Sequence, residues 1–310
     1  MTTATTLPTA LLASPTVPVA ALMAASDFDN NVTAWGVLPN SDAIASTMAS
    51  YEKQSSWVNT QPMYYAPLGA PLVAMNVSPG CNNFVGVGPG EVPSEVPMPS
   101  EVNLNGSSDN PLIIYSSLEV YELWQVSEDS PTSYSACWGG AAPLASFTGV
   151  FNGTFGMSAS GISYAATIIS ENDVKSGAIR HAIAVELPYC DGYVAPAVRG
   201  DCANTGDPAG APAEGQWFRF APGTTCGTAC NNPFADLVFQ AISTYGMVVT
   251  DNTGGSCAAL VMEQPSDWAA QGYAGEDPIT AALDGAPVYS AVAGLPWGDL
   301  QAISPVLGGG

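Results

Sequence analysis

The sequence predicts a mostly β protein with a β-sandwich or jelly-roll-like fold and a few short helices. Glycine and proline are frequent, with 32 and 26 copies in 310 residues. Both residues interrupt regular structure, and the β-branched residues between them fit a pleated sheet, so this composition is typical of short strands joined by many turns. Hydrophobic residues make up 47% of the chain, which is enough to form a buried core.

The central part of the chain supplies the predicted strands. Runs of β-forming residues that end at Gly, Pro, Asn or Ser occupy 111–115, 118–126, 146–151, 162–169, 178–187, 192–198 and 216–221. A further strand is predicted over 247–251, ahead of the turn sequence Asp251-Asn-Thr-Gly-Gly255. Residues 88–105 carry four prolines with acidic residues between them, which predicts a long polyproline-like surface loop.

Two helices are predicted. Residues 41–53 have apolar side chains at helical spacing after a capping Asn or Ser, and residues 233–245 begin with a proline and end before a glycine. The Thr/Ala/Pro-rich residues 1–26 predict an extended arm. Residues 27–310 contain no fixed-period repeat and no linker, so we expect one β-rich domain there.

The charge balance limits the possible partners. The chain has 27 acidic residues against five Lys and Arg and one His, a net charge of −22, yet only 10% of its residues are charged. Five bases cannot neutralise a run of phosphates, so nucleic acid and anionic membrane surfaces are excluded as partners. No apolar run is long enough for a transmembrane helix, and no nucleotide-binding motif is present, so no cofactor is expected.

The seven cysteines favour disulfides in an oxidising compartment. Their spacing and the single His do not match a zinc site, so no metal is expected. The locally plausible bridges are Cys226–Cys230 and Cys190–Cys202, with one thiol left over and the remaining pairing open. Four N-x-S/T sequences add weak support for a secreted glycoprotein, at Asn31, Asn76, Asn105 and Asn152.

Two polar side chains fall on apolar faces of predicted strands. Strict alternation places His181 among Ile and Val, and Glu122 in line with Leu, Val and Trp. A buried carboxylate is costly unless it is paired, so we expect Glu122 to lie near His181, Arg199 or Arg219. With Asp251 at the end of its strand these groups would form an acid/base site. The alternative is a structural pair that fixes strand register.

Further candidates concern the ligand. Asp109 is a second possible partner carboxylate for Glu122, and Arg199, Arg219, Trp124 and Trp217 are candidate ligand-binding side chains. Tryptophan stacks on sugar rings as readily as it fills a core, so its presence alone leaves both roles open.

Several segments together resemble a family of secreted proteins with no established activity. They are Val120-Tyr-Glu-Leu-Trp124, Ser158-Ala-Ser-Gly161, Gly177-Ala-Ile-Arg-His-Ala182, Pro196-Ala-Val-Arg199, Glu214-Gly-Gln-Trp-Phe-Arg219 and Tyr245-Gly-Met-Val-Val-Thr-Asp251. The resemblance spans residues 27–268 and implies one extracellular domain with Glu122, His181, Arg199 and Asp251 at its marked polar positions. The sequence departs from the family at Asn110-Pro111, where an Arg-His pair is expected.

Two functions are compatible with these features. The first is a secreted domain that binds or cleaves polysaccharide, with Glu122 as proton donor or nucleophile and Asp251 or Asp109 as the second carboxylate. The second is a non-catalytic structural protein whose copies assemble into an extracellular filament or surface layer through the N-terminal arm. Polysaccharide and copies of the chain itself are therefore the expected partners.

Overall fold

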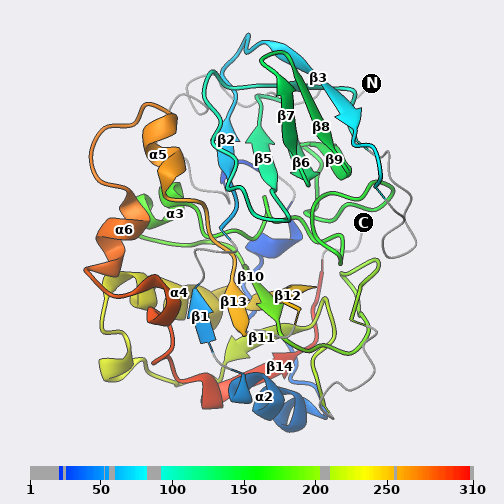
Figure 1. The fold of residues 1–310 in the computed structure, drawn as a ribbon. Coiled ribbons are helices and arrows are strands. Elements are labelled where there is room, and N and C mark those ends of the chain that lie inside the picture. The colour runs from blue at the N-terminus through cyan, green and yellow to red at the C-terminus, as the bar shows by residue number, and fades with distance from the viewer. Residues whose placement is uncertain are drawn as a thin grey trace.

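The fold is built from three β-sheets with short helices around one of them. The computed structural model describes residues 21–23, 26–51, 53–55, 60–81, 92–202, 210–254 and 257–307. Within these residues the two four-stranded sheets lie in the upper part of Figure 1 and the six-stranded sheet in the lower part. The prediction of a mostly β, sandwich-like fold with a few short helices is confirmed.

The six-stranded sheet is mixed. Its central strands β10 and β12 run parallel, with Ile183 opposite Met247, while most other neighbours are antiparallel. In spatial order the strands are β1 (Lys53–Ser55), β13 (Ala258–Leu260), β10 (Ile183–Leu187), β12 (Met247–Asn252), β11 (Trp217–Phe220) and β14 (Leu300–Ile303).

The two smaller sheets pack face to face. One contains β2 (Met63–Tyr65), β5 (Leu112–Tyr115), β6 (Glu119–Trp124) and β9 (Trp138–Pro143), and the other contains β4 (Glu95–Pro97), β3 (Leu72–Val77), β8 (Ser133–Ala136) and β7 (Ser127–Ser130).

Strand β5 connects two hydrophobic cores. Because side chains alternate along a strand, Leu112 and Ile114 pack with the sheet of β4, β3, β8 and β7, whereas Ile113 and Tyr115 pack toward the six-stranded sheet. Both sets are fully buried. The strand is therefore apolar at every position, as expected when both faces of a sheet are covered.

Helices cover the other face of the six-stranded sheet. The apolar stripe of α4 (Pro233–Thr244) and residues of α2 (Ser41–Ser50) and α6 (Pro278–Leu283) share a core with this face. The shorter α3 (Glu171–Ser176) and α5 (Ser266–Ala270) lie to one side in Figure 1. Short 3-10 helices occupy Asp27–Asp29, Gly227–Ala229, Val288–Ser290 and Trp297–Asp299. Within the described chain, no helix is both long and apolar enough to cross a bilayer.

Three predicted strands are absent. Residues 146–151, 162–169 and 192–198 form only isolated bridges, such as Val150 with Ile162. Hydroxyl side chains compete with strand pairing there, since Ser158 Oγ donates to the Ile162 carbonyl at 2.6 Å and Thr167 Oγ1 to the Ser163 carbonyl at 2.8 Å. Strand β10 likewise starts at Ile183 and not at residue 178. The predicted 88–105 loop contains β4, although residues 82–91 lie outside the described residues.

Three disulfides join Cys81 to Cys137, Cys190 to Cys202 and Cys226 to Cys230, which confirms both predicted local bridges. The seventh cysteine, Cys257, lies outside these bridges.

The predicted arm falls mostly outside the described residues, which exclude 1–20, 24 and 25. Its last described part, Leu22 and Met23, is buried in the core together with Phe28. The division into an arm and one domain stays a prediction.

The cap of α4 generates a stability prediction. Asn232 Oδ1 accepts a hydrogen bond from the Ala235 backbone N–H at 2.7 Å, and its amide donates to the Ala291 carbonyl at 3.2 Å. We expect Asn232→Ala to lower the free energy of unfolding by about 1–2 kcal/mol in urea denaturation. Gln240→Ala, at an exposed position of the same helix, is the control, and an equal loss in both variants would contradict the capping role.

Candidate active site

The site is organised by the ends of two parallel strands. Glu186 on β10 lies opposite Asp251 on β12, because the strand register shifts by one residue after the Val185–Val249 pair and leaves Thr250 as an extra residue. Such bulges re-aim side chains and are common beside active sites. Without it Glu186 would face Thr250, so the bulge is what brings the two carboxyl groups together.

A tyrosine hydroxyl lies between these carboxyl groups. Tyr164 Oη donates to Glu186 Oε1 at 2.7 Å and lies 3.4 Å from Asp251 Oδ2. The two carboxyl oxygens are therefore no more than about 6 Å apart, a limit that includes the spacing of about 5–5.5 Å in retaining glycosidases. Asp251 is also held by the backbone N–H of Ala159 at 2.9 Å and by that of Asn252 at 2.8 Å.

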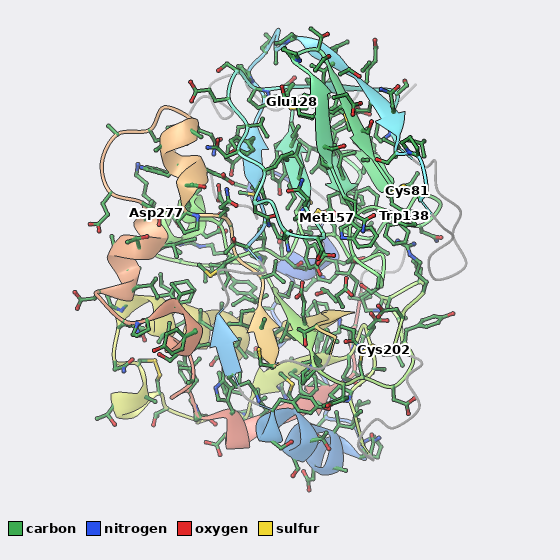
Figure 2. All side chains as sticks on the ribbon, in the orientation of Figure 1. Cys81, Glu128, Trp138, Met157, Cys202 and Asp277 are labelled. Carbon is green, nitrogen blue, oxygen red and sulfur yellow. A yellow bond between two sulfur atoms is a disulfide. The ribbon has the colours of Figure 1, made fainter. Side chains whose placement is uncertain are left out.

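Both carboxyl groups line a pocket of about 250 Å³. Figure 2 labels Met157, which lines the pocket, between the upper sheets and the six-stranded sheet. The complete lining is Gln61, Asn105, Ser107, Asp109, Pro111, Trp124, Phe155, Met157, Ala159, Tyr164, Glu186, Asp201, Asp251, Asn252 and Thr253.

One wall of the pocket is aromatic. Trp124 at the end of β6 packs against Trp138 with ring centroids 4.9 Å apart, and Trp138 packs on Phe155 at 5.7 Å. The guanidinium of Arg199 lies 4.5 Å from the centroid of Phe155 and donates to the backbone carbonyls of Phe151 and Phe155. Arg199 therefore holds the wall in place and is not itself a lining residue.

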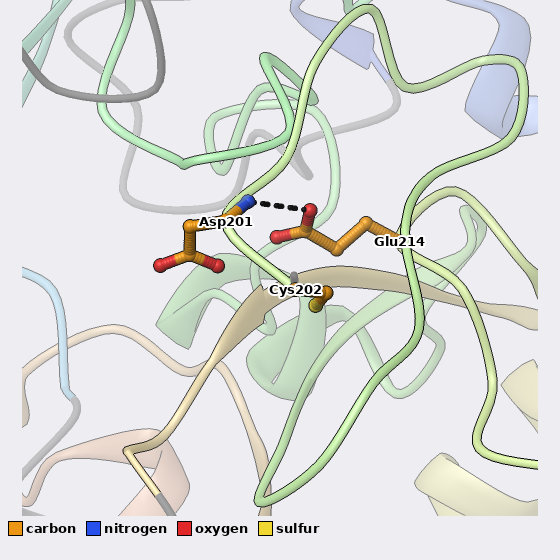
Figure 3. Close-up of side chains that lie close together, drawn as sticks. All are labelled: Asp201, Cys202 and Glu214. Carbon is orange, nitrogen blue, oxygen red and sulfur yellow. Dashed lines mark hydrogen bonds between the residues drawn. The ribbon is translucent and has the colours of Figure 1, made fainter. Parts of the chain in front are cut away.

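A second carboxyl pair adjoins the pocket. Glu214 Oε2 accepts a hydrogen bond from the backbone N–H of Asp201 at 3.1 Å, as Figure 3 shows. A side chain at Gly200 would not fit, because its Cβ would lie 1.8 Å from Glu214 Oε2. Asp201 directly precedes Cys202, and the Cys190–Cys202 disulfide holds Cys202 near the end of β10.

This pair is not a metal site as it stands. Within the described part of the chain, Asp201, Cys202 and Glu214 are the only three acidic, His or Cys residues whose ligand atoms lie within 4.8 Å of one another. The Cys202 sulfur is bonded to Cys190, so it is not a thiolate and cannot serve as an anionic ligand. Only the carboxyl groups of Asp201 and Glu214 remain as candidate metal ligands in this group.

Burial raises the pKa of the acids around the pocket. The pKa of Asp251 lies well above its usual range because of burial and the nearby charges of Asp201 and Glu186. Burial, together with Asp251 and Asp201, raises the pKa of Glu214 to about 10, and burial also raises the pKa of Asp109 and Asp201. The raised pKa values favour the protonated forms of Asp251 and Glu214, and Asp251, which lines the pocket, is thereby suited to donate a proton.

The structure brings three of the predicted site residues together. Asp251, Asp109 and Trp124 all line the pocket, from β12, from the loop before β5 and from β6. Arg199 stands behind this wall, in contact with Phe155.

Glu122 lies elsewhere, and the expectation that it pairs with a base was wrong. Its side chain is fully buried and accepts hydrogen bonds from Ser163 Oγ at 2.5 Å and the Ala165 N–H at 2.8 Å. Burial raises its pKa to about 7, although these hydrogen bonds offset part of the effect. Glu122 therefore fixes the 163–165 segment, which includes Tyr164, and is a positioning residue without access to substrate.

His181 also has a structural environment. Its Nε2 lies 3.2 Å from Asp173 Oδ2 and its Nδ1 lies 2.9 Å from the Ala182 carbonyl, and both His181 and Asp173 are fully buried. Burial lowers the pKa of His181, but Asp173, the Ala182 carbonyl and Asp29 together outweigh burial and the net shift is upward. The residue precedes β10, so strand alternation did not apply to it.

The two remaining candidates belong to the framework. Arg219 donates to the Val32 carbonyl at 2.6 Å and to Gln301, and Trp217 is a fully buried core residue stacked on Phe28 with centroids 5.4 Å apart. Neither lines the pocket, so their assignment as ligand-binding residues is corrected.

Sequence reasoning missed Glu186, Asp201 and Tyr164. Glu186 lies in the same predicted strand, 178–187, as His181, and its position four residues before Cys190 could have placed it near the disulfide. Asp201 precedes the predicted Cys190–Cys202 bridge, which could have placed it beside the end of that strand. Tyr164 had no distinctive signal, since it lies in an irregular segment.

The environment of Glu122 predicts a large loss of stability on truncation. Glu122→Ala leaves the Ser163 hydroxyl and the Ala165 N–H without their acceptor and creates a cavity, so the free energy of unfolding should fall by about 3 kcal/mol or more. Glu128→Ala, at an exposed position on β7, is the control and should change it by less than about 0.5 kcal/mol. Equal effects in urea denaturation would contradict the assigned role.

The raised pKa of Glu122 predicts a pH effect. Between about pH 4.5 and pH 7 the folded chain keeps a proton on Glu122 that the unfolded chain has lost, so this group makes unfolding easier as pH rises. The slope is at most about 1.4 kcal/mol per pH unit. Glu122→Gln should flatten the dependence of the free energy of unfolding on pH in this range, and an unchanged slope would show that Glu122 is ionised when folded.

Comparison with known protein families, with curated proteins and with solved structures found no match to this chain. The resemblance to a family of secreted proteins therefore stays a prediction. Any function has to be inferred from the chemistry of the pocket: paired carboxyl groups, a tyrosine hydroxyl between two of them and an aromatic wall.

Proposed function

We propose that the protein is a secreted glycan-cleaving enzyme in which Asp251 is the general acid and Glu186 the partner carboxylate. The observation that carries the proposal is the Glu186–Tyr164–Asp251 arrangement at the base of an aromatic-walled pocket. Cleavage of a glycosidic bond by acid/base catalysis needs two carboxyl groups in different protonation states within about 5–9.5 Å.

The environments of the two groups favour different roles. Asp251 has a pKa well above its usual range, because it is buried next to other acids, and can therefore donate a proton to the leaving oxygen at neutral pH. Glu186 accepts a hydrogen bond from Tyr164, which stabilises its charged form. A Glu186 carboxylate within about 6 Å of Asp251 is suited to attack the sugar carbon directly, which would retain the anomeric configuration.

The pocket also offers surfaces for a sugar ring. A volume of about 250 Å³ is enough for one ring, and Trp124 presents an aromatic face next to the polar groups of Asn105, Ser107 and Asn252. Asp109, on the loop before β5, is the other lining carboxylate that could assist catalysis.

The disulfides support the same proposal. Three disulfides are typical of an oxidising compartment, where polysaccharide is a common substrate. The structural-protein alternative rests on the N-terminal arm, of which residues 1–20 lie outside the described residues, and no observation in the described part favours it.

The proposal is tested by a degradation screen over polysaccharides of different sugar and linkage, read out as reducing ends released. Asp251→Asn and Glu186→Gln should each lower kcat at least about 100-fold, with little change in KM, because each removes a group that acts in the transition state. Asp109→Asn measures the contribution of the other lining carboxyl group.

Two matched variants make this result specific. Glu122→Gln keeps a buried acceptor for Ser163 and should retain activity to within about tenfold, and the exposed Glu128→Gln should be equal to wild type. Full activity of Asp251→Asn would overturn the proposal, and so would the absence of cleavage of every polysaccharide by the wild type.

A further inference from the structure

The ionisable Asp, Glu, Lys, Arg and His positions that line the pocket are all acidic. Four of its lining residues are acids, namely Asp109, Glu186, Asp201 and Asp251, and none is Lys, Arg or His. Arg199, the base nearest to this wall in the described contacts, points its guanidinium at the ring of Phe155 and at backbone carbonyls. A sugar bearing carboxylate, sulfate or phosphate would meet no cationic side chain among these lining residues.

The Asp201–Glu214 pair carries a negative charge at the pocket wall. Glu214 is fully buried, and neither Glu214 Oε1 nor Asp201 Oδ1 receives an N–H or O–H hydrogen bond within the described residues. One proton shared between the two carboxyl groups satisfies both oxygens. Burial raises the pKa of Asp201 as well, while its hydrogen bond with Glu214 lowers it, and the pKa of Glu214 is raised further, to about 10. We therefore expect Glu214 to keep this proton. The lining member of the pair is therefore the carboxylate.

The cavity suits an organic cation better than a bare ion. Its volume of about 250 Å³ is several times that of one water molecule, and one wall is made of Trp124 and Phe155. Apart from the group that includes the disulfide sulfur of Cys202, no three acidic, His or Cys residues in the described part place ligand atoms within 4.8 Å of one another. Hard cations need such convergence of oxygens, whereas an ammonium group on a sugar ring needs one or two carboxylates.

We propose that the sugar unit bound in this pocket carries a protonated amino group, so that the substrate class is a polysaccharide of amino sugars with free amines. The inference rests on the proposed glycan-cleaving function and specifies its substrate. Asp201 receives the ammonium group in a charge-assisted hydrogen bond, and Asp109, which lines the same pocket, adds to the negative potential.

The test compares three oligosaccharides of the same length and β-1,4 linkage: one of glucosamine, one of N-acetylglucosamine and one of glucose. Binding is measured by titration calorimetry at about pH 5.5, where the amine is protonated, with the Glu186→Gln variant so that turnover is at least about 100-fold slower. We expect the glucosamine oligomer to bind at least about tenfold more tightly than the other two, with an affinity that falls as salt is added.

Variants then assign the preference to the carboxylate. Adding Asp201→Asn should remove at least about fivefold of the preference for glucosamine, and adding Asp109→Asn should remove a smaller part, while the exposed Glu128→Gln should leave it unchanged. Asp109 is exposed, so its variant reports on the charge even if Asp201→Asn fails to fold.

The outcomes separate this inference from the proposed function. Equal or tighter binding of the glucose or N-acetylglucosamine oligomer, with cleavage still dependent on Asp251, would overturn the amino-sugar inference and leave the glycan-cleaving function standing. If no oligosaccharide is bound and no polysaccharide is cleaved, both fail. Millimolar Ca²⁺ that raises Tm in wild type but not in Asp201→Asn would assign the charge to a metal ion and would also overturn the inference.

Discussion

The shortage of bases is the constraint on which the polar interior depends. Twenty-seven acids share five Lys and Arg and one His, and the bases are themselves largely committed to the backbone: Lys53 donates to the Met48 and Tyr51 carbonyls, and Arg219 to that of Val32. Among the described residues, His181 pairs with the buried Asp173 at 3.2 Å. Buried carboxyl groups must therefore be satisfied by hydroxyls, by backbone N–H groups or by a proton.

Each of these solutions occurs in the structure, with a different consequence. Asp267 accepts hydrogen bonds from the Tyr64 hydroxyl at 2.7 Å and the Met63 N–H at 2.8 Å, and thereby ties α5 to β2. Glu122 ties β6 to the 163–165 segment in the same way. Glu214 instead lies beside the acids Asp201 and Asp251, which together with burial raise its pKa to about 10. Acids with neutral donors give rigidity, whereas acids that meet other acids acquire raised pKa values and become candidates for proton transfer.

The sequence predicted the elements that are determined by interactions between residues close together in the chain. Helix α4 has its cap, its N-terminal proline and its apolar stripe in one continuous segment, and β5, β6, β11 and β12 are apolar runs bounded by turn residues. The 146–169 region has similar composition but a different structure, because Ser158, Ser163 and Thr167 direct their hydroxyls to nearby backbone groups. Whether a hydroxyl faces solvent or the backbone is a tertiary outcome that composition does not encode.

The candidate site was only partly predictable because its geometry depends on the bulge in β12 and on the Cys190–Cys202 disulfide. Asp251 was identifiable as an acid at a strand end, but alternation alone pairs Glu186 with Thr250, and only the extra residue in β12 moves Asp251 opposite Glu186. Asp201 is 15 residues from Glu186 along the chain, and it reaches the same edge because the Cys190–Cys202 disulfide closes the intervening loop. Glu122 illustrates the converse: alternation correctly placed it among apolar residues, yet full burial without a base makes it a structural acceptor. In a chain so poor in bases, a carboxyl group at an apolar position is therefore weak evidence for catalysis, and a carboxyl group that adjoins another at the end of a strand is the stronger indicator.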